Sequence, residues 1–271
     1  MTDDADRDAP PPESLAATAE AAVRAAGAYL ADRFRDGDTV GAFETDDVKA
    51  AADEAAERLA FDRIHADFPN HSLHGEESGR AGEGPVEWIV DPLDGTNNYA
   101  IDYPSIASAV AARVDGEAVA AAIHEPLVDD CYVAVRDGGA RLNGEPLPPA
   151  PRDRPLERST VSLVVGLPAV RDESLSAEVA SVRSALRGRC KRVLETWSPC
   201  VDWGLLARGS IAGVVCAYPD VFEQEAGELL ASEAGVVSAS ADGYYVGALD
   251  EATRTELAEA LPVAVGDGDE K

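Results

Sequence analysis

Apolar residues recur at helical spacing in two segments near the start of the chain, and short apolar runs follow them. Residues 14–35 are rich in alanine, and their pattern predicts a helix with Ser14 as its N-cap. Residues 46–67 predict a second helix, which Pro69 ends. The short runs are typical of strands separated by turns. We predict strands at 71–75, 87–91, 105–114, 118–124 and 131–136, followed by a hairpin at 138–147.

After a proline- and arginine-rich connection at residues 148–158, strand-like and helix-like segments alternate to the end of the chain. The predicted strands are 160–166, 190–195, 213–218 and 235–239, and the predicted helices are 172–187, 199–208, 224–234 and 251–260. Alternation of this kind favours a layered α/β architecture.

The composition narrows the classes of partner. The chain has 271 residues, and 51 acidic against 23 basic residues give a net charge of −28. Such a chain should repel nucleic acid and anionic lipid, so we predict neither as a partner, and a solvated acidic surface of a salt-loving kind is the simplest explanation of the charge. Four scattered cysteines without a C-x-x-C pair favour a reducing compartment, and we predict a cytoplasmic protein. Residues 1–13 and 264–271 are acidic and predict disordered tails.

The stretch VDPLDGTNNY at residues 90–99 holds the first candidate chemistry. Pro92 favours a β-turn over residues 91–94, which would bring the carboxylates of Asp91 and Asp94 together. Two close carboxylates are costly unless they are protonated or bridged by a cation, and Mg²⁺ is a hard cation that binds such oxygens. The Leu93 carbonyl is a further oxygen that could point inward. The alternative, a simple turn that ends a strand, stays open for this motif alone.

A second acidic motif, HGEES at residues 74–78, lies one loop upstream and supplies Glu76 and Glu77. On its own it is equally compatible with a solvated acidic loop. The two motifs together are much rarer than either alone. The combination is a glycine and an acid, then a strand, and then Asp-Pro-x-Asp-Gly-Thr.

Together, GEES and WIVDPLDGTNNY resemble the two signature stretches of the inositol monophosphatase family of Mg²⁺-dependent phosphatases. The resemblance extends to the segment that precedes GEES, to GGARLNGEPL and to VDWGLLARGSIAGVV, and it covers roughly residues 14–261. It implies a five-layer αβαβα sandwich, a metal- and phosphate-binding half at 14–150 and a second half at 151–263 that completes the substrate pocket.

The resemblance also implies the roles of individual residues. Glu76, Asp91, Asp94, Glu223 and the Leu93 carbonyl would be metal ligands for Mg²⁺. The catalytic residues would be Glu76, Thr96 and Asp53. Thr96 would position the attacking water, and Asp53 would orient Thr96. Substrate would contact Gly95, Thr96 and Ser198. The implied reaction is hydrolysis of a small phosphorylated metabolite, such as an inositol or sugar phosphate, by water that the metal activates, and a homodimer is implied as well.

Two segments of the second half depart from the family pattern. Where the family has W-D-x-A-A-G, this chain has FEQEAG at residues 222–227, so Glu223 replaces an aspartate, and Asp220 is a rival ligand. A carboxylate at a helix start is favoured by the helix dipole even without metal. Where the family has a small G-[ST]-A-A segment, this chain has the bulky TWSPC at 196–200. For Asp202, on the helix that follows, we predict a solvated or capping role.

Three functions therefore stay open. The leading one is a Mg²⁺-dependent phosphomonoesterase for an inositol or sugar phosphate. Fructose 1,6-bisphosphate is an alternative substrate within the same family, and a nucleotide 3′-phosphate is a weaker one. The third is a pseudoenzyme that binds a metal or a phosphometabolite without turnover, which the altered FEQEAG and TWSPC segments favour and the intact Glu76, Asp91, Asp94 and Thr96 oppose.

Overall fold

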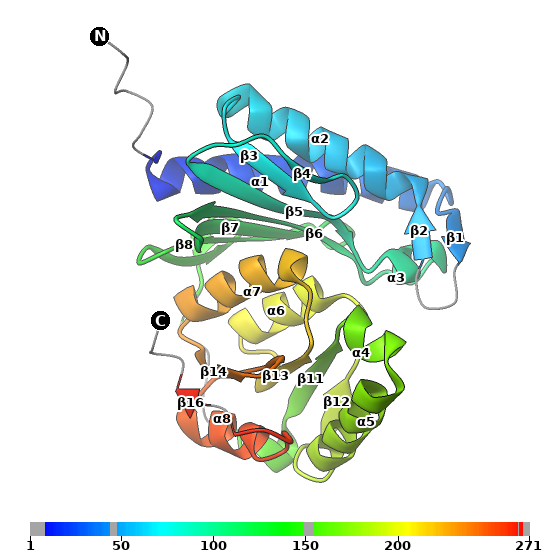
Figure 1. Ribbon diagram of the computed structural model, residues 1–271, viewed down its shortest axis with the longest axis vertical. Helices are drawn as coiled ribbons and strands as arrows, with labels where there is room; N and C mark the ends of the chain where they lie inside the picture. The colour runs from blue at the N-terminus through cyan, green and yellow to red at the C-terminus, as the bar shows by residue number, and fades with distance from the viewer. Residues whose placement is uncertain (1–8, 44–47, 149–153, 265, 268–271) are drawn as a thin grey trace.

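The computed structural model describes residues 9–43, 48–148, 154–264 and 266–267. Helices and sheets alternate in five layers, which confirms the predicted αβαβα sandwich (Figure 1). Helices α1 (Pro12–Arg35) and α2 (Ala51–Asp67) form the first layer. They pack on a sheet because the many alanines of both helices leave flat apolar faces that approach it closely.

The second layer is, among the described residues, an eight-stranded sheet of order β10-β9-β8-β7-β6-β5-β3-β4. Its pairs are antiparallel except for β3 with β5. Its strands are β3 (Ser72–Gly75), β4 (Gly79–Ala81), β5 (Val86–Asp94), β6 (Ala107–Val114), β7 (Glu117–Glu125), β8 (Asp130–Val135), β9 (Gly139–Leu142) and β10 (Glu145–Pro146). A separate hairpin pairs β1 (Gly41–Phe43) with β2 (Val48–Ala50), and the short helix α3 (Thr96–Ala100) follows β5.

The third layer consists of α6 (Pro199–Ala207) and α7 (Val221–Glu233), which lie between the two sheets (Figure 1). The fourth is a sheet of order β12-β11-β13-β15-β14-β16. Its strands are β11 (Thr160–Val165), β12 (Arg192–Leu194), β13 (Gly213–Ala217), β14 (Val237–Ala241), β15 (Tyr244–Ala248) and β16 (Gly266–Asp267). Helices α5 (Glu173–Arg187) and α8 (Glu251–Ala258) form the fifth layer, and α4 (Leu167–Arg171) connects β11 to α5.

Three apolar clusters hold these layers together. One joins α1 and α2 to the outer face of the first sheet, with Trp88 fully buried in it. The second fills the space between the sheets around Trp203, and the third lies between the second sheet and its outer helices. Every layer therefore buries an apolar face against its neighbour, as a layered architecture requires.

Several predicted boundaries differ from the structure. Helix α1 begins at Pro12 with Pro11 as its N-cap, so the Ser14 cap is wrong; proline suits the first helical turn because its missing N–H has no partner there anyway. The helix predicted over 46–67 begins only at Ala51, because residues 48–50 pair in the β1–β2 hairpin. Residues 46–47, and the predicted boundary between the halves at 150–151, lie outside the described residues.

Further differences concern individual elements, the C-terminal tail and the burial of one residue. Helix α7 begins at Val221 rather than at residue 224, and α3 and β15 were not predicted. Gly266 and Asp267, within the predicted C-terminal tail, pair with β14. Asp202 is buried, so the solvated role predicted for it is wrong. None of the helices in the described part of the chain is long and apolar enough to cross a membrane.

Candidate active site

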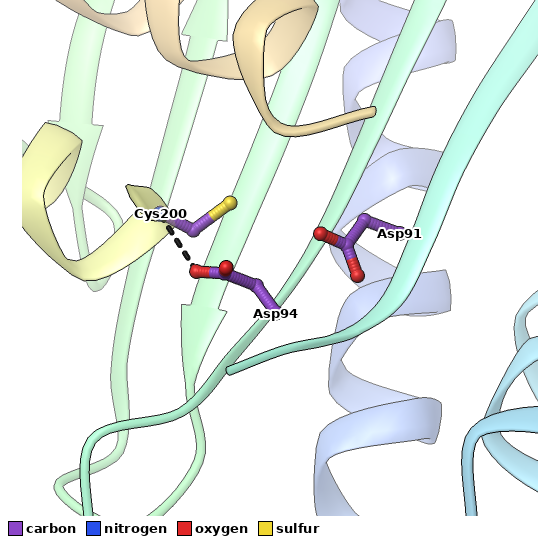
Figure 2. A group of neighbouring side chains, drawn as sticks. All are labelled: Asp91, Asp94 and Cys200. Carbon is purple, nitrogen blue, oxygen red and sulfur yellow. Dashed lines mark hydrogen bonds between the residues drawn. The ribbon is translucent and has the colours of Figure 1, made fainter. Parts of the chain in front are cut away.

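The motif that carries the two aspartates is the end of a strand and not the predicted turn. β5 continues to Asp94, but its register against β6 shifts between Asp91, which faces Ala109, and Asp94, which faces Ala107. In a regular strand two residues three apart point to opposite faces of the sheet. The irregularity changes that alternation, as a bulge does. The result is that carboxylate oxygens of Asp91 and Asp94 lie within 4.8 Å of each other (Figure 2).

The residues that follow reverse the chain tightly. Gly95 has a φ of 89°, a left-handed conformation that favours glycine, and a Cβ there would lie 2.9 Å from the Ser105 carbonyl oxygen. The Thr96 hydroxyl donates a hydrogen bond to the Leu93 carbonyl at 3.0 Å. That carbonyl oxygen has a second lone pair, so the bond leaves it able to accept another partner. The end of β5 and the turn after it thus present a carbonyl, a hydroxyl and two carboxylates within six residues of chain.

Glu76 reaches the same place from the neighbouring strand. Its backbone N–H donates to the Val90 carbonyl at 3.2 Å, which holds the loop after β3 against β5. Gly75 packs closely against α2, and a Cβ there would lie 2.0 Å from Glu57 Oε2, so a larger residue would displace that side chain. The same Glu57 oxygen accepts the N–H of Glu77 at 3.0 Å. The glycine of the GEES motif therefore permits the close packing that positions the acid after it.

Helix α7 brings two more carboxylates from the other half of the chain. Asp220 is its N-cap and accepts the Phe222 N–H at 3.4 Å, and Glu223 Oε1 accepts the Asp220 N–H at 3.3 Å. This reciprocal pattern is a capping box, in which each side chain satisfies a free N–H of the first turn. Both residues line one cleft with Glu76 and Asp94.

The carboxylates of this cleft strongly disfavour full ionisation. Burial, and then the neighbouring Glu76 and Asp94, raise the pKa of Asp91 well above its usual range. Burial raises the pKa of Asp94 to about 6, although hydrogen bonds from Ser198 and Cys200 oppose the shift. Glu76 keeps solvent contact at the mouth of the cleft, but the surrounding protein and the Glu77 carboxylate raise its pKa to about 8. For Glu223, burial and then Asp94 raise the pKa well above normal.

A divalent cation would relieve this repulsion, and the residues present fit one. Asp91 Oδ1 is buried and has no hydrogen-bond partner in the described structure. A buried oxygen without a partner is expected where a cation binds. The donors are carboxylates and one carbonyl, the hard oxygen set that Mg²⁺ and similar cations prefer. The predicted metal ligands Glu76, Asp91, Leu93, Asp94 and Glu223 all line the cleft, and within this set Asp91 and Asp94 have ligand atoms within 4.8 Å of each other.

Ser198 and Asp53 are not among the described residues that line the cleft. Ser198 is fully buried, and its hydroxyl donates to Asp94 Oδ2 at 2.8 Å. Asp53 is buried in the first turn of α2, and its charge contributes to the raised pKa of Glu76. Both residues therefore act on the acidic cluster, one by a hydrogen bond and one by charge.

Cys200 is a neighbour that the sequence did not reveal. Its N–H donates to Asp94 Oδ2 at 2.7 Å, and its sulfur lies within 4.8 Å of ligand atoms of Asp91 and Asp94 (Figure 2). Burial raises the pKa of the thiol well above its usual range, so the group is neutral and a poor ligand for a hard cation. No nucleophile motif surrounds this cysteine, and only the start of α6 beside β5 places it here.

Comparison with known proteins identifies the class that this fold and cleft define. The chain matches the Inositol monophosphatase family over residues 12–264 and belongs to it. It is 30% identical over 229 residues to Nus factor SuhB of Escherichia coli, with 83% of this chain and 84% of that protein covered. It is 29% identical over 204 residues to Inositol monophosphatase 2 of Solanum lycopersicum, covering 70% and 73%.

Solved structures agree with this assignment. The chain superimposes on the suhB protein of Bartonella henselae with a TM-score of 0.83 at 22% identity, covering 92% of this chain and 98% of that one; at this identity the match shows the fold. It matches an inositol monophosphatase from Anabaena with a TM-score of 0.76 at 25% identity, covering 92% and 95%. Membership of this metal-dependent family, with the acidic cluster in place, supports a phosphatase.

Proposed function

We propose that the chain is a Mg²⁺-dependent phosphatase that hydrolyses a small phosphate monoester, with inositol monophosphates and sugar phosphates as the first candidates. The observation that carries the proposal is the buried pair of Asp91 and Asp94, with one unpartnered oxygen, beside Glu76 in a cleft of about 430 Å³. A cleft of this size accommodates one small-molecule ligand.

Glu76, Asp91, Asp94 and the Leu93 carbonyl would hold the cation from the strand side, and Glu223 would hold it from α7. When bound, a divalent cation supplies charge neutralisation on the phosphoryl group and a more nucleophilic water. Glu223 already serves the capping box through one oxygen, Oε1. Its other carboxylate oxygen is the one we assign to the cation.

The remaining residues position the attacking water and the phosphate, or orient the metal ligands. Thr96 lies at the lip of the cleft, where its hydroxyl can hold the attacking water, and Gly95 lets the backbone approach the phosphate because it has no side chain. Asp53 is the acid that we assign, from the family resemblance, to orient Thr96. Ser198 keeps Asp94 in one orientation, so its part is positioning rather than substrate contact.

The cleft favours a substrate with one phosphate. None of the described residues that line it is lysine or arginine. A second phosphate, as in fructose 1,6-bisphosphate, would need a cationic partner that these residues do not supply. This observation favours a monophosphate over the bisphosphate alternative.

The predicted partners and location rest on the composition and on the family. A net charge of −28 supports our prediction that nucleic acid is not a partner. Nus factor is the name of relatives and not of this chain. If this chain had the role that this name denotes, our prediction that it does not bind nucleic acid would have to be tested first. A cytoplasmic location and a homodimer are likewise predictions.

Phosphate release from a panel of esters tests the proposal. The panel contains inositol monophosphate, glucose 6-phosphate, fructose 1,6-bisphosphate and a nucleoside 3′-monophosphate, each measured in high salt with Mg²⁺ and with excess chelator. We expect release from a monophosphate that chelator abolishes and Mg²⁺ restores. Release that persists in chelator would contradict the metal mechanism, and binding of a phosphate ester without any release would establish the pseudoenzyme instead.

A further inference from the structure

Trp197 occupies an unusual position at the mouth of the cleft. It has a φ of 56°, in the left-handed region that a bulky residue rarely adopts, and its side chain is 50% exposed. Trp88 and Trp203 are fully buried, so Trp197 alone of the three tryptophans faces solvent. The left-handed backbone costs conformational free energy, and the exposed ring costs hydration free energy. Such a conformation persists only where the surrounding structure enforces it.

Partly buried hydrogen bonds hold the segment that carries Trp197 in this conformation. The side chain of Asn98, on α3, donates to the Thr196 carbonyl at 2.8 Å and to the Trp197 carbonyl at 3.5 Å. The Thr196 hydroxyl donates to Asp202 at 2.9 Å and accepts the Ser198 N–H at 3.1 Å. The indole is therefore mounted on a rigid segment that is fixed directly to the helix after Asp94, and not on a free loop.

Part of the lining of the cleft that holds Trp197 is apolar. Phe43, Val165, Leu167 and Val170 line the same cleft as Trp197. The nearby Glu195 is not free for a hydroxyl group, since Arg183 donates to both of its oxygens at 2.7 Å. A polyol would leave many of its hydroxyl groups unpaired against such a wall, which costs binding energy, whereas a flat apolar ring would bury area against it.

We propose that Trp197 is a stacking platform for the alcohol part of the substrate, and that the preferred substrate is a phosphate monoester whose alcohol carries a planar aromatic ring, an aryl alcohol or a nucleoside. This inference rests on the proposed function for the reaction, and it replaces the polyol of the inositol and sugar phosphates named there with an alcohol that carries a planar ring. The ring stacks on the indole while the single phosphate lies at the acidic cluster. Aromatic stacking tolerates different rings because each has a π-face.

Fluorescence quenching tests the platform without turnover. Acrylamide should quench mainly Trp197, because the other two tryptophans are buried. We expect adenosine and phenol, each added with Mg²⁺, to protect the fluorescence from quenching, and myo-inositol to leave it unchanged. Protection by myo-inositol equal to that by adenosine, or protection by none of the three, would overturn the inference, and either result stands whether or not the protein releases phosphate.

Three variants separate stacking from a structural role. Trp197→Gly suits the left-handed backbone and removes the ring, Trp197→Phe keeps a flat ring, and Trp197→Leu keeps bulk without one. Val128→Ala, at another exposed apolar residue, is the matched control. We expect Trp197→Gly and Trp197→Leu to lower kcat/KM about tenfold or more for phenyl phosphate and a nucleoside monophosphate relative to inositol monophosphate, and Trp197→Phe to restore most of the loss.

The two ring substrates also identify the source of the ring. A larger loss for the nucleoside than for phenyl phosphate indicates a nucleoside, and the reverse indicates an aryl alcohol; both support the platform. An equal loss for all three esters, inositol monophosphate included, would make Trp197 structural and overturn the inference. If wild type released phosphate from no ester, the proposed function would fail, and the quenching result alone would decide the platform.

Discussion

The two sides of the cleft are built in different ways. On the strand side, β5 supplies Asp91 and Asp94 from a sheet that is packed on both faces, and the loop after β3 supplies Glu76. On the helix side, the starts of α6 and α7 supply Trp197, Cys200 and Glu223 through capping and turn geometry. The GEES and DPLDGT motifs of the strand side resemble the family signatures, whereas FEQEAG and TWSPC on the helix side depart from them.

This difference assigns different tasks to the two sides. Asp91 and Asp94 are buried, repel each other and have raised pKa values, a costly arrangement that makes chemical sense around a cation. Trp197 and the apolar cleft residues Phe43, Leu167 and Val170 carry no charge, so we assign them to the alcohol part of the substrate. The strand side would then carry the reaction, and the helix side would decide which ester undergoes it.

We expect the largest effect from a substitution that removes a carboxylate on the strand side. Asp94→Asn keeps the shape of the side chain and removes its charge, so we expect kcat to fall about 10²-fold or more, because a metal ligand is lost. Asp115→Asn is the matched control, since this exposed aspartate has a φ of 52° that asparagine also tolerates. A melting temperature near that of wild type would show that the fold survives. Turnover near the wild-type value would remove Asp94 from the catalytic set.

Thr96→Ala should have a comparable but smaller effect on the same side. The hydroxyl that contacts the Leu93 carbonyl is lost, and with it the group we assign to the attacking water. We expect kcat to fall about 10²-fold and KM to change little, because positioning of the nucleophile matters mainly in the transition state. A change in KM alone would place Thr96 in substrate binding instead.

The acidic cluster also predicts how stability depends on pH. The pKa values of Glu76 and Asp94 in the folded protein, about 8 and about 6, exceed those of an unfolded chain, about 4. The folded state therefore binds more protons, and the stability that these protonated groups provide is fully present below about pH 4 and is lost as the pH rises towards 8. In chelator, the melting temperature should fall between pH 5 and pH 8.

Mg²⁺ should reverse that loss, because the cation replaces the protons. At pH 8 and a concentration about 100-fold above Kd, binding stabilises the fold by about 2.7 kcal/mol, whereas at pH 5 protons compete and the gain is smaller. Asp91→Asn should flatten the pH dependence measured in chelator. A Mg²⁺-induced shift equal at both pH values would contradict a cation site built from these carboxylates.

A smaller effect separates Glu223 from Asp220. Asp220→Asn should be mild, because asparagine caps helices as well as aspartate does. Glu223→Gln should raise the Mg²⁺ concentration needed for half-maximal activity by about tenfold, with little change in melting temperature, since the helix-dipole contribution is only about 0.3–1 kcal/mol. If Asp220→Asn alone raised that concentration, Asp220 would be the ligand; if neither did, the helix side would hold no metal.

The smallest effect concerns Ser198. Its hydroxyl is one of two groups that donate to Asp94 Oδ2, and the Cys200 N–H remains when it is removed. We expect Ser198→Ala to lower kcat only a few-fold, about the effect of one hydrogen bond. The KM values for all esters should change little and in the same direction. A large change in KM for one ester would instead return Ser198 to substrate binding.

The sequence predicted the strand side well because a local motif defines it. Asp91 and Asp94 lie in one short stretch, and their proximity follows from chain geometry over four residues, although the geometry is an irregular strand rather than a turn. The layered fold was predictable for a similar reason, since each layer has its own periodicity. Helix α3 was missed because five residues are too few to show a period.

The helix side was less predictable because it depends on contacts distant in sequence. Cys200 reaches Asp94, and Asn98 reaches Thr196, across about one hundred residues of chain. The capping box that joins Asp220 to Glu223 could have been found from its D-x-x-E spacing, which is a helix-start signal. That signal would have moved the predicted start of α7 from residue 224 to residue 221.

Direct binding of a divalent cation tests the central claim most closely. Mn²⁺ is titrated into wild-type protein, Asp94→Asn and the Asp115→Asn control at pH 8, and free Mn²⁺ is followed by electron paramagnetic resonance, with Mg²⁺ added as competitor. We predict that wild type and Asp115→Asn bind Mn²⁺ equally and release it to Mg²⁺, and that Asp94→Asn binds at least about tenfold more weakly. Equal Mn²⁺ affinity in all three proteins would show that the buried carboxylates of β5 are not the metal site.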